Sequence, residues 1–188
     1  MSVIDLDSFH NGPKILEILN FSDLRGSFEI LFQLNQITDI EPSFPNMIQW
    51  NCIKAKQTSV RGFHGAKESA EHWKVLTCVT GRIRDAYLDV RPQSETFGSI
   101  AHIDLEQENP KLVLIPPGFA HAFECLSPES LVIYGTNIAY IDQREIDISP
   151  LDSRWRKIWE NPKLFSDRDM RSDSLATLIK LRTFEKDG

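Results

Sequence analysis

The middle of the chain contains short runs of apolar residues separated by turn-forming residues. The turns include Thr80-Gly81, Asn109-Pro110 and Pro117-Gly118. Within residues 85–90, apolar and polar positions partly alternate, which is the pattern of a strand with one buried face. Many short strands at regular spacing are typical of a β-sandwich or β-barrel. The runs predict strands at residues 47–53, 75–80, 83–90, 99–104, 112–115, 122–126 and 131–134.

Both ends of the chain lack this regular pattern. At the N-terminal end one strand-like run covers residues 28–34, and Pro42 and Pro45 then predict a loop. Near the other end, residues 153–159 are compatible with one or two helical turns. Residues 172–184 have the apolar spacing of an amphipathic helix, with Ser172 or Asp173 as its N-cap.

These patterns predict a single domain over residues 1–188. A chain of this length buries enough surface to fold without a disulfide or a structural metal. The expected class is all-β: a β-jelly-roll barrel over about 47–141, an N-terminal strand arm over 1–46 and short C-terminal helices over 150–188.

Charge and cysteine content narrow the possible partners. The net charge of −6 and the pI of about 5.4 argue against nucleic acid as a partner. No apolar run is long enough to span a membrane, and the N-terminus does not resemble a signal peptide. Cys52, Cys78 and Cys125 are widely spaced, so we interpret them as buried free thiols. A cytoplasmic protein is therefore expected.

A short motif adds detail to the predicted fold. The spacing Pro116-x-Gly118-x-x-His121 is similar to the second motif of the cupin superfamily, which implies a cupin-type jelly roll. Metal-binding cupins add a His-x-His and a Glu, whereas His64 here is followed by Gly65. We expect no metal and no cofactor; the structural alternative for His121 is a hydrogen-bonded core histidine.

Several longer segments, in this order, resemble the dTDP-4-dehydrorhamnose 3,5-epimerase family over roughly residues 21–170. Each segment is close to a motif of that family in residue type and spacing. They are Asp23-Leu24-Arg25-Gly26-Ser27-Phe28, Gln49-Trp50-Asn51, Arg61-Gly62-Phe63-His64, Lys74-Val75-Leu76, Ser94-Glu95-Thr96-Phe97-Gly98 and Ser166-Asp167-Arg168-Asp169.

The resemblance implies four catalytic roles. A 4-keto sugar carries weakly acidic protons at C3 and C5, and inversion needs a base on one face and an acid on the other. His64 would be the base, with Asp169 fixing its tautomer. Lys74 would stabilise the C4 oxyanion, and Tyr134 would return a proton from the opposite face. Each of these residues also has a structural alternative to its catalytic role. His64 would lie at a strand end, and Lys74 would be exposed. Tyr134 would pack in the core, and Asp169 would be solvated.

The resemblance also implies a substrate and a binding set. The ligand would be a nucleotide-linked 4-keto-6-deoxy sugar, supplied for surface polysaccharide such as lipopolysaccharide. Arginine forks suit its diphosphate. Asp85 and His121 would form a second pair on the ketone side. The remaining expected binding residues are Arg25, Gln49, Asn51, Arg61, Tyr140 and Arg168.

Departures from the family pattern leave other functions open. Gly65-Ala66 replaces an aromatic residue and a glutamine, so the nucleotide, the sugar and the number of inverted centres stay open. The alternatives are a sugar-nucleotide 3,4-ketoisomerase, a non-catalytic sugar-nucleotide-binding cupin and a metal-dependent cupin oxygenase. The arm has unpaired strand edges, and the family exchanges such strands between subunits, so a homodimer is expected.

Overall fold

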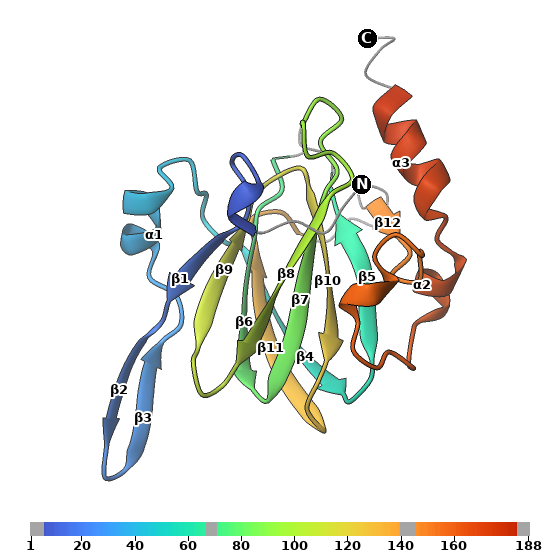
Figure 1. Cartoon of the computed structure of the whole chain (residues 1–188). Helices are drawn as coiled ribbons and strands as arrows, with labels where there is room; N and C mark the ends of the chain where they lie inside the picture. The colour runs from blue at the N-terminus through green and yellow to red at the C-terminus, as the bar shows by residue number, and fades with distance from the viewer. Residues whose placement is uncertain (1–5, 67–70, 140–145, 184–188) are drawn as a thin grey trace.

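Two antiparallel sheets facing each other form the body of the protein (Figure 1). The structure is a computed structural model, which describes residues 6–66, 71–139 and 146–183. Within this part of the chain, one five-stranded sheet has the order β1-β9-β6-β11-β4 and the other has the order β12-β5-β10-β7-β8. The strands are β1 (Lys14–Glu17), β4 (Gln49–Lys56), β5 (Val60–Gly65), β6 (Lys74–Thr80), β7 (Arg82–Asp89), β8 (Ile100–Glu106), β9 (Lys111–Ile115), β10 (Phe119–Cys125), β11 (Glu129–Thr136) and β12 (Ile146–Ile148).

The N-terminal arm contributes strand β1 to the first sheet, a separate two-stranded hairpin and a helix. Strands β2 (Leu19–Asp23) and β3 (Gly26–Ile30) pair with each other and project away from the barrel (Figure 1). The strand-like run predicted at 28–34 is wrong in its second half, because β3 ends at Ile30 and helix α1 (Leu34–Ile40) begins four residues later. Ile37 of α1 is buried against the outer face of the first sheet. This packing explains why the helix contains apolar residues.

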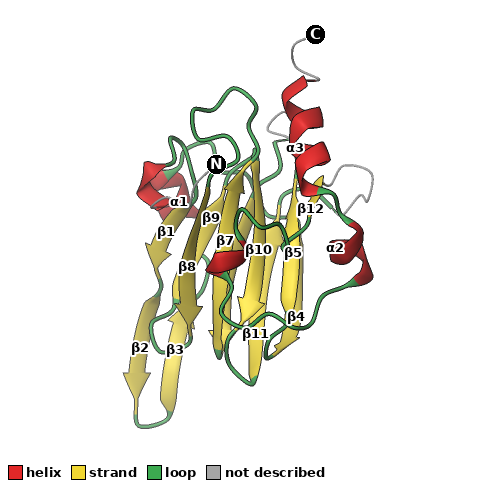
Figure 2. Cartoon of the chain, turned by 45° about the vertical axis from the view of Figure 1, so that its right-hand side comes forward, coloured by secondary structure: helices red, strands yellow, loops and turns green. Residues whose placement is uncertain are grey.

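The C-terminal segment covers the outer face of the second sheet (Figure 2). It contains a short 3-10 turn at Arg156–Ile158, helix α2 (Asp167–Arg171) and helix α3 (Ser174–Thr183). The predicted cap is confirmed, because the Asp173 carboxylate accepts a hydrogen bond from the Ala176 amide at 3.0 Å. Buried Trp155 packs edge-on against Phe63 of β5. This packing anchors the segment to the barrel.

Alternation along the strands separates the core between the sheets from the cores outside them. On β7, Ile83 and Tyr87 point between the sheets, whereas Ala86 and Leu88 face the C-terminal segment. β7 is buried on both faces over most of its length, because the other sheet covers one face and the C-terminal segment covers the other. Polar side chains that point between the sheets, such as Asp85, are therefore notable.

The expected all-β jelly-roll class is confirmed by this arrangement and by the structural relatives described below. Cys78 and Cys125 are buried free thiols as predicted, but Cys52 is exposed, because it points outward from β4 at the edge of the sheet. None of the helices in the described ranges has the length and apolar character to cross a membrane.

Candidate active site

A bulge in β5 brings two candidate residues to the same cavity. The register of β5 against β10 shifts by one residue between the pairs His121–His64 and Phe123–Arg61. Without this shift, side chains three residues apart would point to opposite faces of the sheet. With it, Arg61 and His64 both line the space between the sheets.

The cavity lies between the two sheets and has a volume of about 210 Å³. Its lining combines apolar side chains with several cationic and hydrogen-bonding groups, the usual composition of a small-molecule site. Most of the residues expected from the sequence are among them. The lining residues are Gln49, Ile53, Arg61, Gly62, His64, His72, Lys74, His121, Ala122, Phe123, Tyr134, Thr136, Ile138 and Arg168.

The structure brings His64 and Asp169 together across 105 positions of sequence. Nε2 of His64 lies 3.2 Å from Oδ1 of Asp169, whose side chain is almost fully buried. The other carboxylate oxygen accepts a hydrogen bond from Ser166 Oγ at 2.7 Å. Burial raises the pKa of Asp169, but the close contact with His64 and the hydrogen bond from Ser166 outweigh it and hold the pKa below its ordinary value. The aspartate is therefore ionised at neutral pH.

Gly62 makes this approach of Asp169 possible. A methyl group at Gly62 would lie 2.7 Å from the carboxyl carbon of Asp169 and closer still to Oδ1. On its other side it would lie 3.1 Å from Cδ of Pro150. Only glycine leaves the space that the buried carboxylate occupies. Helix α2 then holds the aspartate in place, because its N-cap Ser166 contacts both the backbone and the carboxylate of Asp169.

A second carboxylate, which the sequence did not reveal, contacts the other ring nitrogen of His64. Asp147 is paired directly opposite His64 in the β12–β5 ladder, and its Oδ1 lies 2.8 Å from Nδ1. Arg168 donates to both oxygens of Asp147, from Nε at 2.7 Å and from Nη2 at 2.6 Å. Burial raises the pKa of Asp147, and hydrogen bonds from Arg168 and His64 lower it further than burial raises it. No sequence motif marks Asp147; it reaches His64 through the pairing of β12 with β5.

Lys74 and Tyr134 come from the sheet opposite His64. Lys74 on β6 is buried, and its Nζ donates to the backbone carbonyl of His64 at 3.1 Å. Tyr134 on β11 pairs with Leu76 of β6. Both strands belong to the first sheet, whereas β5 belongs to the second. His64 and Tyr134 therefore line opposite walls of one cavity.

Asp85 and His121 form the expected second pair. Asp85 is fully buried behind the cavity, 3.3 Å from Nδ1 of His121, and it accepts a hydrogen bond from the Tyr87 hydroxyl at 2.7 Å. Burial lowers the pKa of His121, although Asp85 acts in the opposite direction. His121 therefore presents a neutral ring to the cavity, oriented by a buried carboxylate.

Gln49 of β4 lines the cavity, and Asn51 of the same strand is hydrogen-bonded to Gln49. Alternation points Gln49 and Asn51 inward while Trp50 and Cys52 face out. Nε2 of Gln49 donates to Oδ1 of Asn51 at 2.9 Å. The Nδ2 donor of Asn51 is buried without a hydrogen-bond partner among the described residues. Such a donor is suited to a ligand oxygen.

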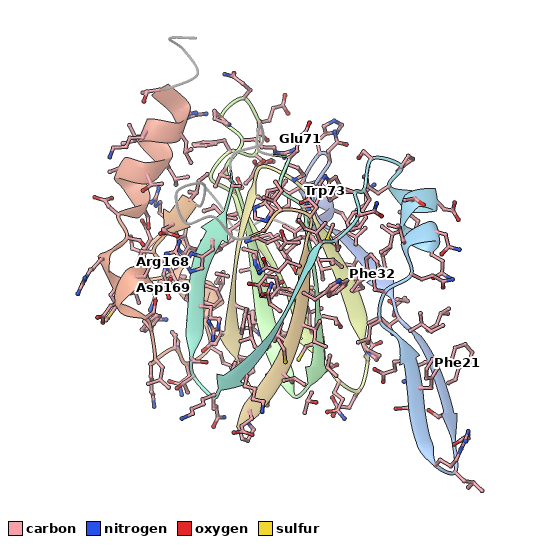
Figure 3. All side chains as sticks on the ribbon, turned by 180° about the vertical axis from the view of Figure 1, so that it is seen from behind. Phe21, Phe32, Glu71, Trp73, Arg168 and Asp169 are labelled. Carbon is pink, nitrogen blue, oxygen red and sulfur yellow. The ribbon has the colours of Figure 1, made fainter. Side chains whose placement is uncertain are left out.

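One expected binding residue, Arg25, lies away from this cavity. Arg25 lies at the turn of the β2–β3 hairpin, where it pairs with exposed Asp23. Figure 3 shows this hairpin, marked by Phe21, on the other side of the molecule from Arg168 and Asp169. Arg25 therefore does not reach the cavity of its own chain, and its role in substrate binding stays a prediction. Tyr140 lies outside the described residues.

His72 is a further lining residue that sequence reasoning missed. Its Nε2 lies 2.6 Å from Oγ1 of Thr136. Burial, with help from the nearby charge of Lys74, lowers the pKa of His72 to about 4. The ring is therefore neutral at ordinary pH. Its position directly before Trp73 and Lys74 could have indicated it as a wall residue.

Comparisons with known proteins identify relatives of this chain. A sequence model of the family described as dTDP-4-dehydrorhamnose 3,5-epimerase matches residues 10–177. The chain is 34% identical to the dTDP-4-dehydrorhamnose 3,5-epimerase of Shigella flexneri over 160 residues, which cover 84% of this chain and 85% of that one. It is 32% identical to the enzyme of that name from Mycolicibacterium smegmatis over 157 residues, 82% of this chain and 77% of that one.

Solved structures give the same result. The fold is similar to a Legionella pneumophila 3,5-epimerase in complex with dTDP-4-keto-L-rhamnose, with a TM-score of 0.82, 27% identity and coverage of 90% and 91%. It is also similar to a 3′-monoepimerase from Streptomyces bikiniensis in complex with dTDP-quinovose, with a TM-score of 0.85, 27% identity and coverage of 96% and 90%. The chain therefore belongs to the dTDP-4-dehydrorhamnose 3,5-epimerase family.

Proposed function

We propose that the protein inverts C3, C5 or both in a nucleotide-linked 4-keto-6-deoxy sugar. One observation carries the proposal: a histidine backed by a buried aspartate and a tyrosine on the facing sheet line the same cavity. Inversion next to a ketone needs proton removal on one face and delivery on the other. Opposite walls with a base and an acid meet that requirement.

The base in this proposal is His64. A neutral imidazole takes a proton from the carbon next to the ketone, and the buried carboxylate of Asp169 stabilises the imidazolium that forms. The hydrogen bond from Ser166 fixes this carboxylate, so Asp169 does not have to reorient when the imidazolium forms. General-base catalysis of this kind contributes about 10²- to 10⁴-fold.

Lys74 and Tyr134 supply the other half of the reaction. The buried Lys74 ammonium stabilises the negative charge that develops on the C4 oxygen, and this interaction is strong in a cavity shielded from water. Tyr134 then donates its hydroxyl proton to the carbon from the face opposite His64. His121, oriented by Asp85, donates a further hydrogen bond on the ketone side.

The nucleotide diphosphate is assigned to the arginines that line the cavity. Arg61 and Arg168 both reach it, and guanidinium forks bind phosphate oxygens in pairs. Gln49 and the unpaired Nδ2 of Asn51 donate to the ligand. The overall charge of −6 makes such a focused cationic pocket necessary for an anionic substrate.

A homodimer is part of the proposal, with Arg25 brought to the partner's cavity. The β2–β3 hairpin carries large apolar side chains that a monomer leaves in water: Phe21 is 56% exposed and Phe28 is 66% exposed. A second copy that covers the hairpin would bury these rings. We also place the protein in the cytoplasm, supplying deoxysugars for surface polysaccharide, because free Cys78 and Cys125 suit a reducing compartment.

Deuterium exchange tests the proposal. The protein is incubated in D₂O with dTDP-4-keto-6-deoxyglucose, and label at C3 and C5 is followed by NMR. Exchange followed by an inverted product is expected. His64→Ala should lose exchange at both carbons, whereas Tyr134→Phe should retain exchange and form little inverted product. Normal inversion by Tyr134→Phe would exclude Tyr134 as the acid.

A further inference from the structure

The ring of His64 is shared between two carboxylates. Asp169 lies 3.2 Å from Nε2, and Asp147 lies 2.8 Å from Nδ1. Both aspartates have pKa values below the ordinary value, after burial is outweighed by their hydrogen bonds, so both are acceptors. Only a ring with a proton on each nitrogen can donate to two acceptors. A base needs one nitrogen with a lone pair facing the substrate.

The burial of the two carboxylates identifies which nitrogen meets the sugar. Asp169 is 3% exposed and is held by Ser166, so the Nε2 side has no room for a ligand. The Asp147 side chain is 32% exposed, and its partner Arg168 lines the cavity. Nδ1 is therefore the nitrogen that can reach the substrate, and in this structure it is hydrogen-bonded to Asp147.

The geometry at Asp169 indicates that the ring is not in its reacting position. Oδ1 of Asp169 is buried, yet it lacks a hydrogen bond of regular geometry among the described residues, although Nε2 is close. The bond from Nδ1 to Asp147 is shorter and well formed. If Asp147 moves away, a small ring rotation aligns Nε2 with Oδ1 and leaves the Nδ1 lone pair toward the cavity.

We propose that Asp147 is a positioning residue that competes with the sugar for Nδ1 of His64, and that Arg168 couples this competition to diphosphate binding. Arg168 donates hydrogen bonds to Asp147 from Nε and from Nη2. A diphosphate also binds a guanidinium fork in a bidentate manner and carries more negative charge than one carboxylate, so it draws Arg168 away and leaves Asp147 without its counter-charge. The proton on Nδ1 then passes to solvent, and His64 becomes the base. This inference rests on the proposed function of His64.

The coupling makes proton removal depend on the diphosphate as well as on the sugar. A keto sugar without its diphosphate has nothing to draw Arg168 away, so its protons should exchange poorly. The remote part of the substrate then contributes to the reaction at the sugar ring.

The first test uses Asp147→Asn, with Asp104→Asn as the matched control. Asp104 is also a partly buried aspartate bound by an arginine fork, that of Arg84, but it lies on β8 at the opposite edge of the sheet. Calorimetry with inorganic diphosphate and with dTDP should give at least about threefold tighter binding for Asp147→Asn, because Arg168 no longer has to leave a carboxylate. Asp104→Asn should bind like the wild type; equal affinities of Asp147→Asn and wild type would overturn the proposal.

The second test separates coupling from a simple change in charge. In ¹⁵N-histidine-labelled protein, with His64 assigned by loss of its signals in His64→Gln, added diphosphate should convert Nδ1 from a protonated to a lone-pair signal. Asp147→Asn should show the lone-pair signal without diphosphate. Tighter binding of diphosphate with unchanged His64 signals would mean that the affinity changes only through the lost charge of Asp147. That result would overturn the proposed coupling.

The third test is the pH profile of turnover. The acid limb of kcat/KM, which reports the free enzyme, should move to lower pH in Asp147→Asn, whereas the limb of kcat, which reports the complex, should not. Movement of both limbs would mean that Asp147 stays on His64 during the reaction, against the proposal. The binding and NMR tests need no turnover, so a protein that passes them but exchanges no sugar proton contradicts the epimerase function instead.

Discussion

Substitution of Gly62 by alanine tests whether Asp169 must sit where the structure places it. The added methyl group would lie 2.7 Å from Cγ of Asp169, whereas carbon atoms in contact lie about 3.5–4.0 Å apart. The methyl cannot move away, because Cδ of Pro150 lies 3.1 Å from it on the other side. The carboxylate must therefore shift by about 1 Å.

Such a shift should lower catalysis more than stability. Loss of the partner that orients a reacting group typically costs about 10- to 100-fold, and misplacement by about 1 Å has a similar cost. We expect Gly62→Ala to reduce kcat for proton exchange by this factor. The free energy of unfolding should fall by about 1–3 kcal/mol, the usual cost of an extra methyl group in a packed interior.

The assay is deuterium exchange into the keto sugar at saturating substrate, with urea unfolding measured in parallel. A double-mutant cycle with Asp169→Ala isolates the cause. If Gly62→Ala acts through the carboxylate, the double variant is no slower than Asp169→Ala alone. Multiplied losses in the double variant, or a kcat within twofold of wild type in Gly62→Ala, would refute the reasoning.

Further predictions concern stability, ionisation and assembly. Asp89→Ala should lower the free energy of unfolding by about 3–5 kcal/mol in urea, because Arg91 is left as a buried unpaired charge; a loss under 1 kcal/mol would contradict this. Burial raises the pKa of Asp89, but hydrogen bonds led by that of Arg91 lower it below the ordinary value, so its contribution is present above about pH 4 and is lost as pH falls through the folded pKa. Urea midpoints of wild type should therefore fall in acid more steeply than those of Asp89→Ala, and parallel curves would count against it. His72, with a pKa of about 4, should show no NMR titration between about pH 5 and 8; a midpoint near 6.5 would show that the ring is not buried. Phe28→Glu should convert a dimer into a monomer in sedimentation velocity, and an unchanged sedimentation coefficient would exclude the hairpin as the interface.

The strands of the barrel could be predicted because their apolar side chains pack between the sheets and, on several strands, also against the segments outside them. β6, β9, β10 and β11 fall within about three residues of the predicted runs. β5 was missed, because Arg61, Gly62 and His64 interrupt the apolar pattern. The bulge that lets both Arg61 and His64 face the cavity depends on pairing with β10, which no local pattern reveals.

The site could be predicted where residues lie in long motifs, and not where only tertiary pairing brings them in. His64, Lys74, Tyr134 and Arg168 line the cavity as expected. Asp147 was not found, because its relation to His64 comes from strand pairing between β12 and β5. Arg25 was assigned from its motif alone, and a motif does not say which chain's cavity a residue serves.

The most direct test of the central claim is the stereochemical outcome of exchange in D₂O. Wild-type protein with dTDP-4-keto-6-deoxyglucose should give product that is inverted and carries deuterium at each inverted carbon, and His64→Ala should slow label uptake by about 10²- to 10⁴-fold. Inverted product without deuterium, or label uptake that survives in His64→Ala at the wild-type rate, would contradict proton removal by His64 across the cavity from Tyr134.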